Sequence, residues 1–259
     1  MTDAPLSFQA IQGTSPHSSG PAKPKWALDL FSGPTHSVVN RLKQLGYQVV
    51  SLDIDPKTKP DLTQDIMQWD FRAAFPKGKF EIIAASVPCT EYSKAKTIGV
   101  RDLTWSDRVV RKVREIVQHF NPEIWWIENT REGLLSHREV VDDLHYLDLD
   151  YCQFCDWGYK KPTRFWGCKR ITNLHPVLCR APQCANAYLA HTANFKHRFV
   201  LGGSNQKFGT SLKGRIPPGW WTTFFNKVNF PLPRMKRTLV TPPSANATER
   251  VIHTEGWRG

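Results

Sequence analysis

The chain contains 259 residues, and its 35 Lys and Arg against 23 Asp and Glu give a formal net charge of +12 at pH 7. This length supports a substantial hydrophobic core, and a content of 40% hydrophobic residues excludes disorder along the whole chain. No run approaches the roughly 18 apolar residues of a membrane span, and residues 1–24 lack the apolar stretch of a signal peptide. We therefore expect a soluble, intracellular protein, and the positive charge favours a polyanionic partner such as nucleic acid.

Strand-like and helix-like segments alternate along most of the chain. Residues 1–24 are rich in Pro, Ser and Gly, have no hydrophobic periodicity and are predicted to form a disordered tail. Short apolar runs typical of buried strands then alternate with segments of helical spacing. The predicted strands are Trp26–Phe31, Gln48–Ile54, Glu81–Ser86, Glu123–Glu128, Asp150–Asp156 and Arg164–Cys168. The predicted helices are Ser37–Leu45, Ser106–Phe120 and Ser136–Leu147.

This alternation predicts an α/β fold with a doubly wound, mostly parallel sheet and helices on both faces. Ligands of such sheets bind beyond the carboxyl ends of the strands, where Gly33, Asp53, Cys89 and Glu128 all fall. The predicted divisions are a catalytic core over 25–172, a small Cys/His-rich lobe over 173–213, a C-terminal element over 214–230 that packs back on the core, and a second disordered tail over 231–259.

Two residues at this edge have the chemistry of a reactive centre. Cys89 follows a buried strand in VPCTEYS, and Pro88 restricts the backbone that leads to it. A thiolate held in this way is a strong nucleophile, whereas the alternative is an inert cysteine. Glu128 ends the apolar strand EIWWIE, so its carboxyl group can donate a proton at the same edge. Its alternative is a solvated acid at a strand end.

Five motifs in this order and spacing resemble the cytosine-5 DNA methyltransferases, which use S-adenosylmethionine. They are DLFSG (Asp29–Gly33), SLDID (Ser51–Asp55), QDI (Gln64–Ile66), VPCTEYS (Val87–Ser93) and IEN (Ile127–Asn129). The chain looks most like the short phage- and virus-type members, which share KPTRxW, here Lys161–Trp166. The resemblance covers residues 25–166, with a weaker echo in RIPPGWW over 215–221.

The resemblance implies a Rossmann-like methyltransferase fold and methyl transfer to C5 of a cytosine that is flipped out of the DNA duplex. The implied catalytic residues are Cys89, which adds to C6 of the base, Glu128, which acts at N3, and Arg164, which contacts the carbonyl oxygen. Arg164 matches the second arginine of the family's RxR element, but the first position is Pro162 here. Lys160 or Lys161 is the candidate substitute for that missing arginine.

The resemblance also implies a binding site for S-adenosylmethionine. Its implied residues are Asp29, Phe31, Ser32, Gly33, Asp53, Ile54, Asp65 and Pro88. Phe31 would stack on the adenine, Asp53 would accept hydrogen bonds from the ribose hydroxyls, and Asp65 would contact the adenine amino group. The family's second glycine pair is absent, because residues 34–37 (PTHS) follow Gly33.

The Cys/His-rich lobe suggests a metal site. Six cysteines are too few for a disulfide scaffold. The spacing of four residues can close a tetrahedral Zn²⁺ site, namely His175, Cys179, Cys184 and His191. Cys168 is an alternative ligand. Cys152 and Cys155 lie three residues apart on a predicted strand and so face opposite sides, which makes them poor ligands together. The alternative interpretation is a basic loop with buried thiols.

The segment over 173–213 is short for the DNA-reading lobe of this family, which suggests short or relaxed target specificity. Three other functions compete with DNA methylation. Cytosine methylation of RNA would use the same catalytic residues, and a catalytically idle relative would only bind nucleic acid. A small-molecule methyltransferase would need neither the Pro-Cys and Glu-Asn pairs nor the positive charge.

Overall fold

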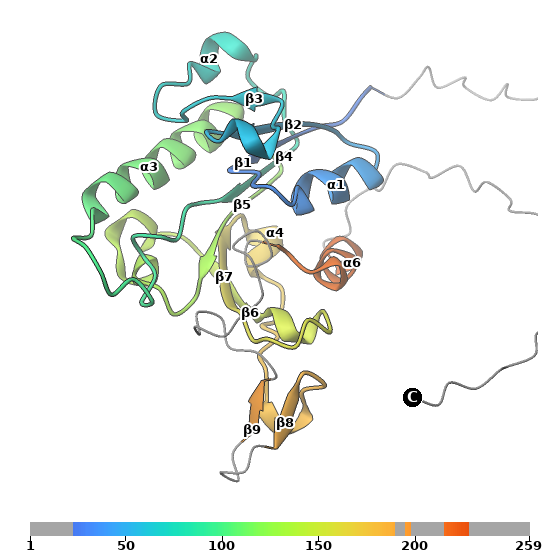
Figure 1. The fold of residues 1–259 in the computed structure, drawn as a ribbon. Coiled ribbons are helices and arrows are strands. Elements are labelled where there is room, and N and C mark those ends of the chain that lie inside the picture. The colour runs from blue at the N-terminus through green and yellow to red at the C-terminus, as the bar shows by residue number, and fades with distance from the viewer. Residues whose placement is uncertain (1–22, 190–194, 198–214, 228–259) are drawn as a thin grey trace, which may run out of the picture.

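The computed structural model describes residues 23–189, 195–197 and 215–227, which form one central sheet with helices and a small second sheet (Figure 1). The seven strands of the central sheet are β1 (Trp26–Leu30), β2 (Gln48–Asp53), β3 (Leu62–Thr63), β4 (Ile82–Ser86), β5 (Ile124–Thr130), β6 (Tyr146–Asp150) and β7 (Pro162–Gly167). Their order is β3-β2-β1-β4-β5-β7-β6, and β7 runs antiparallel to both of its neighbours. The prediction of a mostly parallel sheet is confirmed.

Helices cover both faces of the sheet, with α3 on one side and α1 and α6 on the other (Figure 1). The helices are α1 (Ser37–Gln44), α2 (Phe71–Ala74), α3 (Leu103–Phe120), α4 (Lys169–Thr172) and α6 (Pro218–Lys227), and the 3₁₀ turns are η1 (Pro56–Thr58), η2 (Leu134–His137), η3 (Glu139–Val141), η4 (Tyr151–Gln153) and η5 (Ala181–Gln183). Two buried clusters result, because strand side chains alternate between the faces. Ile127 and Trp166 belong to the cluster on the α3 face, and Trp126 and Phe165 belong to the cluster on the α1 face.

The prediction of a helix over Ser136–Leu147 is wrong. The chain instead forms the turns η2 and η3 and then enters β6. Leu147 and Leu149 alternate with polar residues and are fully buried, which is the period of a strand rather than of a helix. The strand predicted over Asp150–Asp156 is also wrong, because β6 ends at Asp150 and η4 follows directly.

A two-stranded sheet of β8 (Ala187–Leu189) and β9 (Phe195–His197) lies beyond the β6 edge of the central sheet (Figure 1). The segment that leads to it is joined to β6, because the Asp150 amide donates to the Val177 carbonyl at 2.9 Å. These elements belong to the lobe expected over 173–213, of which the structure describes only a part. The lobe boundaries therefore stay a prediction.

The C-terminal helix α6 packs back on the central sheet. Trp220, Trp221 and Phe224 are buried, and the ring centroids of Trp126 and Trp221 are 5.5 Å apart. The tails predicted over 1–24 and 231–259 lie almost wholly outside the described residues. Among the helices that the structure describes, none combines the length and the apolar character that a membrane crossing requires.

Candidate active site

The sheet topology brings several strand ends to one edge. The carboxyl ends of β1, β2, β4 and β5 meet there because these strands are parallel, and the antiparallel strand β7 begins there. A cavity of about 480 Å³ opens at this edge. The residues that line it are Asp29, Phe31–Thr35, Ser37, Val38, Ser86–Thr90, Ser93, Ala95, Glu128–Thr130 and Lys161.

The loop after β1 makes a tight, strained turn at the cavity. Phe31 has φ 63° and Gly33 has φ 60°, and this left-handed region costs a residue other than glycine roughly 1–2 kcal/mol. Three hydrogen bonds tie the turn to β2. The amides of Phe31 and Ser32 donate to the Leu52 carbonyl at 2.8 and 3.2 Å, and the Gly33 amide donates to Asp53 Oδ2 at 2.9 Å. His36 also has a positive φ, 45°, just where the expected second glycine pair is absent. Phe31, whose backbone is strained, lines the cavity, whereas His36 does not.

Asp29 is a buried carboxyl group without a partner at this cavity. It is 1% exposed, and neither of its side-chain oxygens has a hydrogen-bond partner among the described residues. Burial raises the pKa of Asp29 well above its ordinary value, and the nearby Asp53 carboxylate raises it further. The hydroxyl of Ser32, which lines the same cavity, is also buried without a partner in the described part of the chain. These groups are available to a ligand with hydrogen-bonding groups.

Three predicted cofactor residues lie outside the cavity lining: Asp53 is the last residue of β2, Ile54 follows it, and Asp65 follows β3. Asp53 accepts hydrogen bonds from Gly33 and from the Asp55 amide at 3.0 Å, and its carboxylate has capacity for further donors. Ile54 is 65% exposed despite its apolar side chain. Asp65 accepts a hydrogen bond from the Met67 amide at 2.9 Å.

Cys89 lies on a loop that is anchored to the neighbouring strand. The Asn129 side chain of β5 donates from Nδ2 to the Val87 carbonyl at 3.1 Å, and the Ser93 amide donates to the Cys89 carbonyl at 2.8 Å. Pro88 and Cys89 both line the cavity and are both exposed. The sequence-predicted thiol is therefore accessible on a fixed loop.

The charges around Cys89 oppose one another. Desolvation by the surrounding protein raises the pKa of the Cys89 thiol, although the residue itself is exposed at the cavity mouth. The positive charge of Lys161 lowers this pKa, and the negative charge of Glu128 raises it. The balance leaves the pKa above its ordinary value, so the thiol is mostly protonated at neutral pH.

Glu128 is buried and held by two side chains. It is 5% exposed, and its Oε1 accepts hydrogen bonds from Lys161 Nζ at 3.1 Å and from the Tyr151 hydroxyl at 3.3 Å. The Tyr151 amide also donates to the Lys161 carbonyl at 3.1 Å. The sequence analysis does not predict Tyr151 as a site residue, because it places Tyr151 on a strand over Asp150–Asp156 rather than in the turn η4.

Arg164 does not lie where the resemblance implies. Its guanidinium donates to both carboxylate oxygens of Asp148, at 2.7 and 2.9 Å, and stacks on the ring of Tyr146 at 3.7 Å. Phe165, not Arg164, pairs with Glu128 across the strands, and consecutive side chains of a strand point to opposite faces. Arg164 therefore lies on the other face of the sheet and is not part of the cavity lining.

The structure gathers a different set of Cys and His residues from the predicted one. The ligand atoms of Cys152, Cys179, Cys184 and His197 all lie within 4.8 Å of one another. The predicted ligand His175 is exposed and not part of this group, and His191 lies outside the described residues. Cys152 joins the group because it lies in the turn η4 rather than on a strand.

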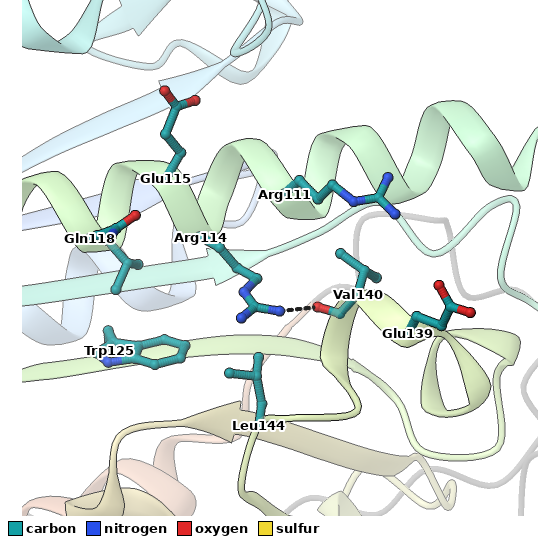
Figure 2. Close-up of a pocket in the computed structure, with 9 residues that line it drawn as sticks. Arg111, Arg114, Glu115, Gln118, Trp125, Glu139, Val140 and Leu144 are labelled. Carbon is teal, nitrogen blue, oxygen red and sulfur yellow. Dashed lines mark hydrogen bonds between the residues drawn. The ribbon is translucent and has the colours of Figure 1, made fainter.

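A second, larger cavity of about 620 Å³ lies between α3 and the segment after η2. Figure 2 shows Arg111 and Arg114 from α3 with Trp125 from β5, and the Arg114 guanidinium donates to the Val140 carbonyl at 2.7 Å. None of the predicted site residues lines this cavity. The smaller cavity at the strand ends is therefore the candidate active site.

The sheet order, the antiparallel β7 and the turn after β1 define a Rossmann-like methyltransferase fold. A family model for the C-5 cytosine-specific DNA methylase matches residues 57–161. The "Probable DNA (cytosine-5)-methyltransferase" of Frog virus 3 (isolate Goorha) is 29% identical over 209 residues, which are 74% of this chain and 94% of the viral protein. Both matches support a relationship to the cytosine-5 methyltransferases, and the chain resembles the virus-type members of that family.

Two solved structures are more distant. A DNMT2 variant of Spodoptera frugiperda has a TM-score of 0.39 and 13% identity, over 60% of this chain and 55% of that one. The human methyltransferase 10 domain containing protein has a TM-score of 0.34 and 9% identity, over 57% of this chain and 73% of that one. This chain thus spans about half the length of the DNMT2 structure, and the fold assignment rests on the strand order of this chain.

Proposed function

We propose that this protein transfers a methyl group from S-adenosylmethionine to C5 of cytosine in DNA, with Cys89 as the nucleophile. The observation that carries the proposal is one cavity lined by an accessible thiol, the Glu128–Lys161 pair and the unpartnered carboxyl group of Asp29. The viral relative and the family model support DNA as the substrate, and the net charge of +12 suits a polyanion.

The residues around the first turn fit S-adenosylmethionine. The methionine ammonium is a donor that suits the unpartnered carboxyl group of Asp29 and the buried hydroxyl of Ser32. Asp53 has carboxylate capacity left for the ribose hydroxyls, and exposed Ile54 offers an apolar surface beside it for the adenine. When bound, S-adenosylmethionine supplies a methyl group that is electrophilic because it is attached to a sulfonium.

The residues of the chain have to make cytosine C5 reactive. The Cys89 thiolate adds to C6, which forms a carbon–sulfur bond and places the electron pair on the ring. The proton that the Cys89 thiol loses passes to Glu128, which then donates it at N3 and so relieves this charge. After C5 has taken the methyl group, a base removes the C5 proton, the carbon–sulfur bond breaks and Cys89 leaves as a thiolate. The N3 proton then returns to Glu128.

We infer that Lys161 takes the place that the resemblance assigned to an arginine. Its ammonium is buried, lines the cavity and lies 3.1 Å from Glu128, whereas Arg164 is paired with Asp148 on the opposite face. The positive charge of Lys161 partly offsets the desolvation and the Glu128 charge that raise the pKa of the Cys89 thiol. The same charge can hold the carbonyl oxygen of a flipped base.

The test is covalent trapping with DNA in which the target cytosines carry fluorine at C5. Fluorine blocks the loss of a proton from C5, so an active enzyme stays attached to the base through sulfur. We expect a denaturant-resistant adduct that forms only with S-adenosylmethionine and is absent in Cys89→Ser. The matched control is Cys168→Ser, which changes a cysteine outside the cavity lining and should form the adduct normally.

The same trapping experiment on DNA and on RNA distinguishes DNA methylation from RNA methylation and from binding without catalysis. An adduct on fluorinated RNA but not on DNA would replace DNA with RNA in the proposal. Binding of DNA without any adduct on either substrate would contradict the catalytic proposal and leave a nucleic-acid-binding protein. An adduct that persists in Cys89→Ser would assign the nucleophile elsewhere.

A further inference from the structure

We propose that Cys152, Cys179, Cys184 and His197 bind one structural Zn²⁺ ion that fastens the β8–β9 sheet to the central sheet. The four residues come from three separate parts of the chain. Cys152 lies in η4 directly after β6, Cys179 and Cys184 flank η5, and His197 ends β9. Their ligand atoms nevertheless lie within 4.8 Å of one another.

The distances suit tetrahedral coordination. Zinc–sulfur bonds of about 2.3 Å and zinc–nitrogen bonds of about 2.0–2.1 Å place sulfur and nitrogen ligands about 3.6 Å apart in a tetrahedron. His197 Nε2 lies 3.5 Å from Cys179 Sγ and 3.4 Å from Cys184 Sγ. Three thiolates and one imidazole are a soft donor set that prefers zinc over magnesium or calcium. Four protein ligands leave no open position, so the site is structural rather than catalytic.

The surroundings of the cluster orient its ligands. Gln153 Nε2 donates to Cys184 Sγ at 3.5 Å, and the Cys179 amide donates to Asp150 Oδ2 at 2.7 Å. The buried Asn186 side chain donates to the Cys152 carbonyl at 2.8 Å, which joins the segment before β8 to η4. Such contacts in the second coordination shell hold ligands in place for a metal.

The small sheet needs an anchor of this kind. Its strands have three residues each, and a two-stranded sheet alone is marginally stable in water. In the described part of this segment the exposed residues include Tyr188 and Leu189, and the buried ones are Cys184 and Asn186. This segment therefore has little apolar core of its own, and metal coordination supplies the missing stabilisation.

A disulfide explains the arrangement less well. A bond between two of the three cysteines would leave the third thiol and His197 unused. The imidazole nevertheless approaches two sulfurs at nearly equal distances, as a shared metal requires.

The experiment measures the metal content of the purified full-length protein after dialysis against metal-free buffer. We expect one zinc ion per chain by inductively coupled plasma mass spectrometry. Cys184→Ser and His197→Ala should lose most of this zinc, whereas the matched controls Cys155→Ser and Cys168→Ser should keep it, because neither cysteine belongs to the cluster. Zinc that is absent from the wild type, or retained in both cluster variants, would overturn the proposal.

A measurement on the wild type covers the case in which the cluster variants fail to fold. Cobalt added to chelator-treated protein should give the visible bands of tetrahedral thiolate coordination, and zinc should abolish them. Three of the six thiols should become reactive towards a disulfide reagent when zinc is removed. Absence of cobalt–thiolate bands, or an intact mass that reveals a disulfide among these cysteines, would refute the site. Neither result depends on methyltransferase activity.

Discussion

Replacing Lys161 with methionine tests whether a buried charge pair organises the active site. The side chains of Lys161 and Glu128 are 9% and 7% exposed, and their charged atoms are 3.1 Å apart. At an effective dielectric constant of about 20, two charges at this distance attract by about 5 kcal/mol. Removing one partner from a buried pair costs about 3–5 kcal/mol, because the other charge stays buried without compensation. We expect Lys161→Met to lower the free energy of unfolding by this amount.

The assay is urea denaturation of the full-length protein at neutral pH, followed by tryptophan fluorescence and circular dichroism. Lys160→Met is the matched control: the Lys160 side chain is 36% exposed, and Arg131 remains 3.4 Å from their shared partner Asp150. The control should cost less than about 1 kcal/mol. Adding Glu128→Gln to Lys161→Met should restore most of the lost stability. Equal losses for Lys161→Met and Lys160→Met, or a double variant with the summed loss of its two single variants, would refute the reasoning.

Further predictions concern Cys89 and Asp29 in the cavity lining and Asp53 outside it. The rate of Cys89 alkylation by iodoacetamide should keep rising with pH beyond the ordinary thiol range. The pH at half-maximal rate should increase in Lys161→Met and decrease in Glu128→Gln. Stopped-flow or mass-spectrometric rates measure this profile. Asp29→Asn should weaken S-adenosylmethionine binding by about 10- to 150-fold in calorimetry, equal to the loss of a charged hydrogen bond of about 1.5–3 kcal/mol. The folded state raises the pKa of Asp29, so ionisation of this carboxyl group lowers the free energy of unfolding as the pH rises above the ordinary Asp range. An asparagine at this position cannot ionise, and Asp29→Asn should therefore stabilise the ligand-free protein at neutral pH in urea denaturation. Asp53→Ala should weaken cofactor binding by about 1–3 kcal/mol in calorimetry, because the ribose hydroxyls lose their carboxylate acceptor and the Gly33 amide loses its partner; unchanged binding would remove Asp53 from the site.

The parallel part of the sheet could be predicted because its strands are buried on both faces. Continuous apolar runs such as Trp26–Phe31 and Glu81–Ser86 have few alternatives to a buried strand, and the structure ends them within one residue of the prediction. Residues directly after such strands, including Cys89, could therefore be placed at one edge before any contact was known. The position of the candidate active site follows from strand order alone.

The edge of the sheet could not be predicted in the same way. The sequence analysis predicts a helix over Ser136–Leu147, so it assigns Tyr146 and Leu147 to the end of a helix rather than to the start of β6 (Tyr146–Asp150). That error displaced the turn η4 and with it Tyr151 and Cys152. Arg164 was misplaced for another reason. A motif match fixes the position of a residue in the sequence, but only the register of β7 against β5 fixes which face the residue occupies.

One turn connects the two sites. Tyr151 and Cys152 are consecutive in η4, and the hydroxyl of the first bonds to Glu128 while the sulfur of the second joins the Cys/His cluster. An interaction that fixes Cys152 therefore also restricts the adjacent Tyr151, whose hydroxyl contacts Glu128 in the cavity lining. Removal of the proposed zinc ion should therefore loosen η4 and the Tyr151–Glu128 hydrogen bond, although none of the four proposed ligands lines the cavity. Chelation that lowers methyl transfer without changing S-adenosylmethionine affinity would follow from this connection, whereas an equal loss of both would indicate general unfolding of the chain.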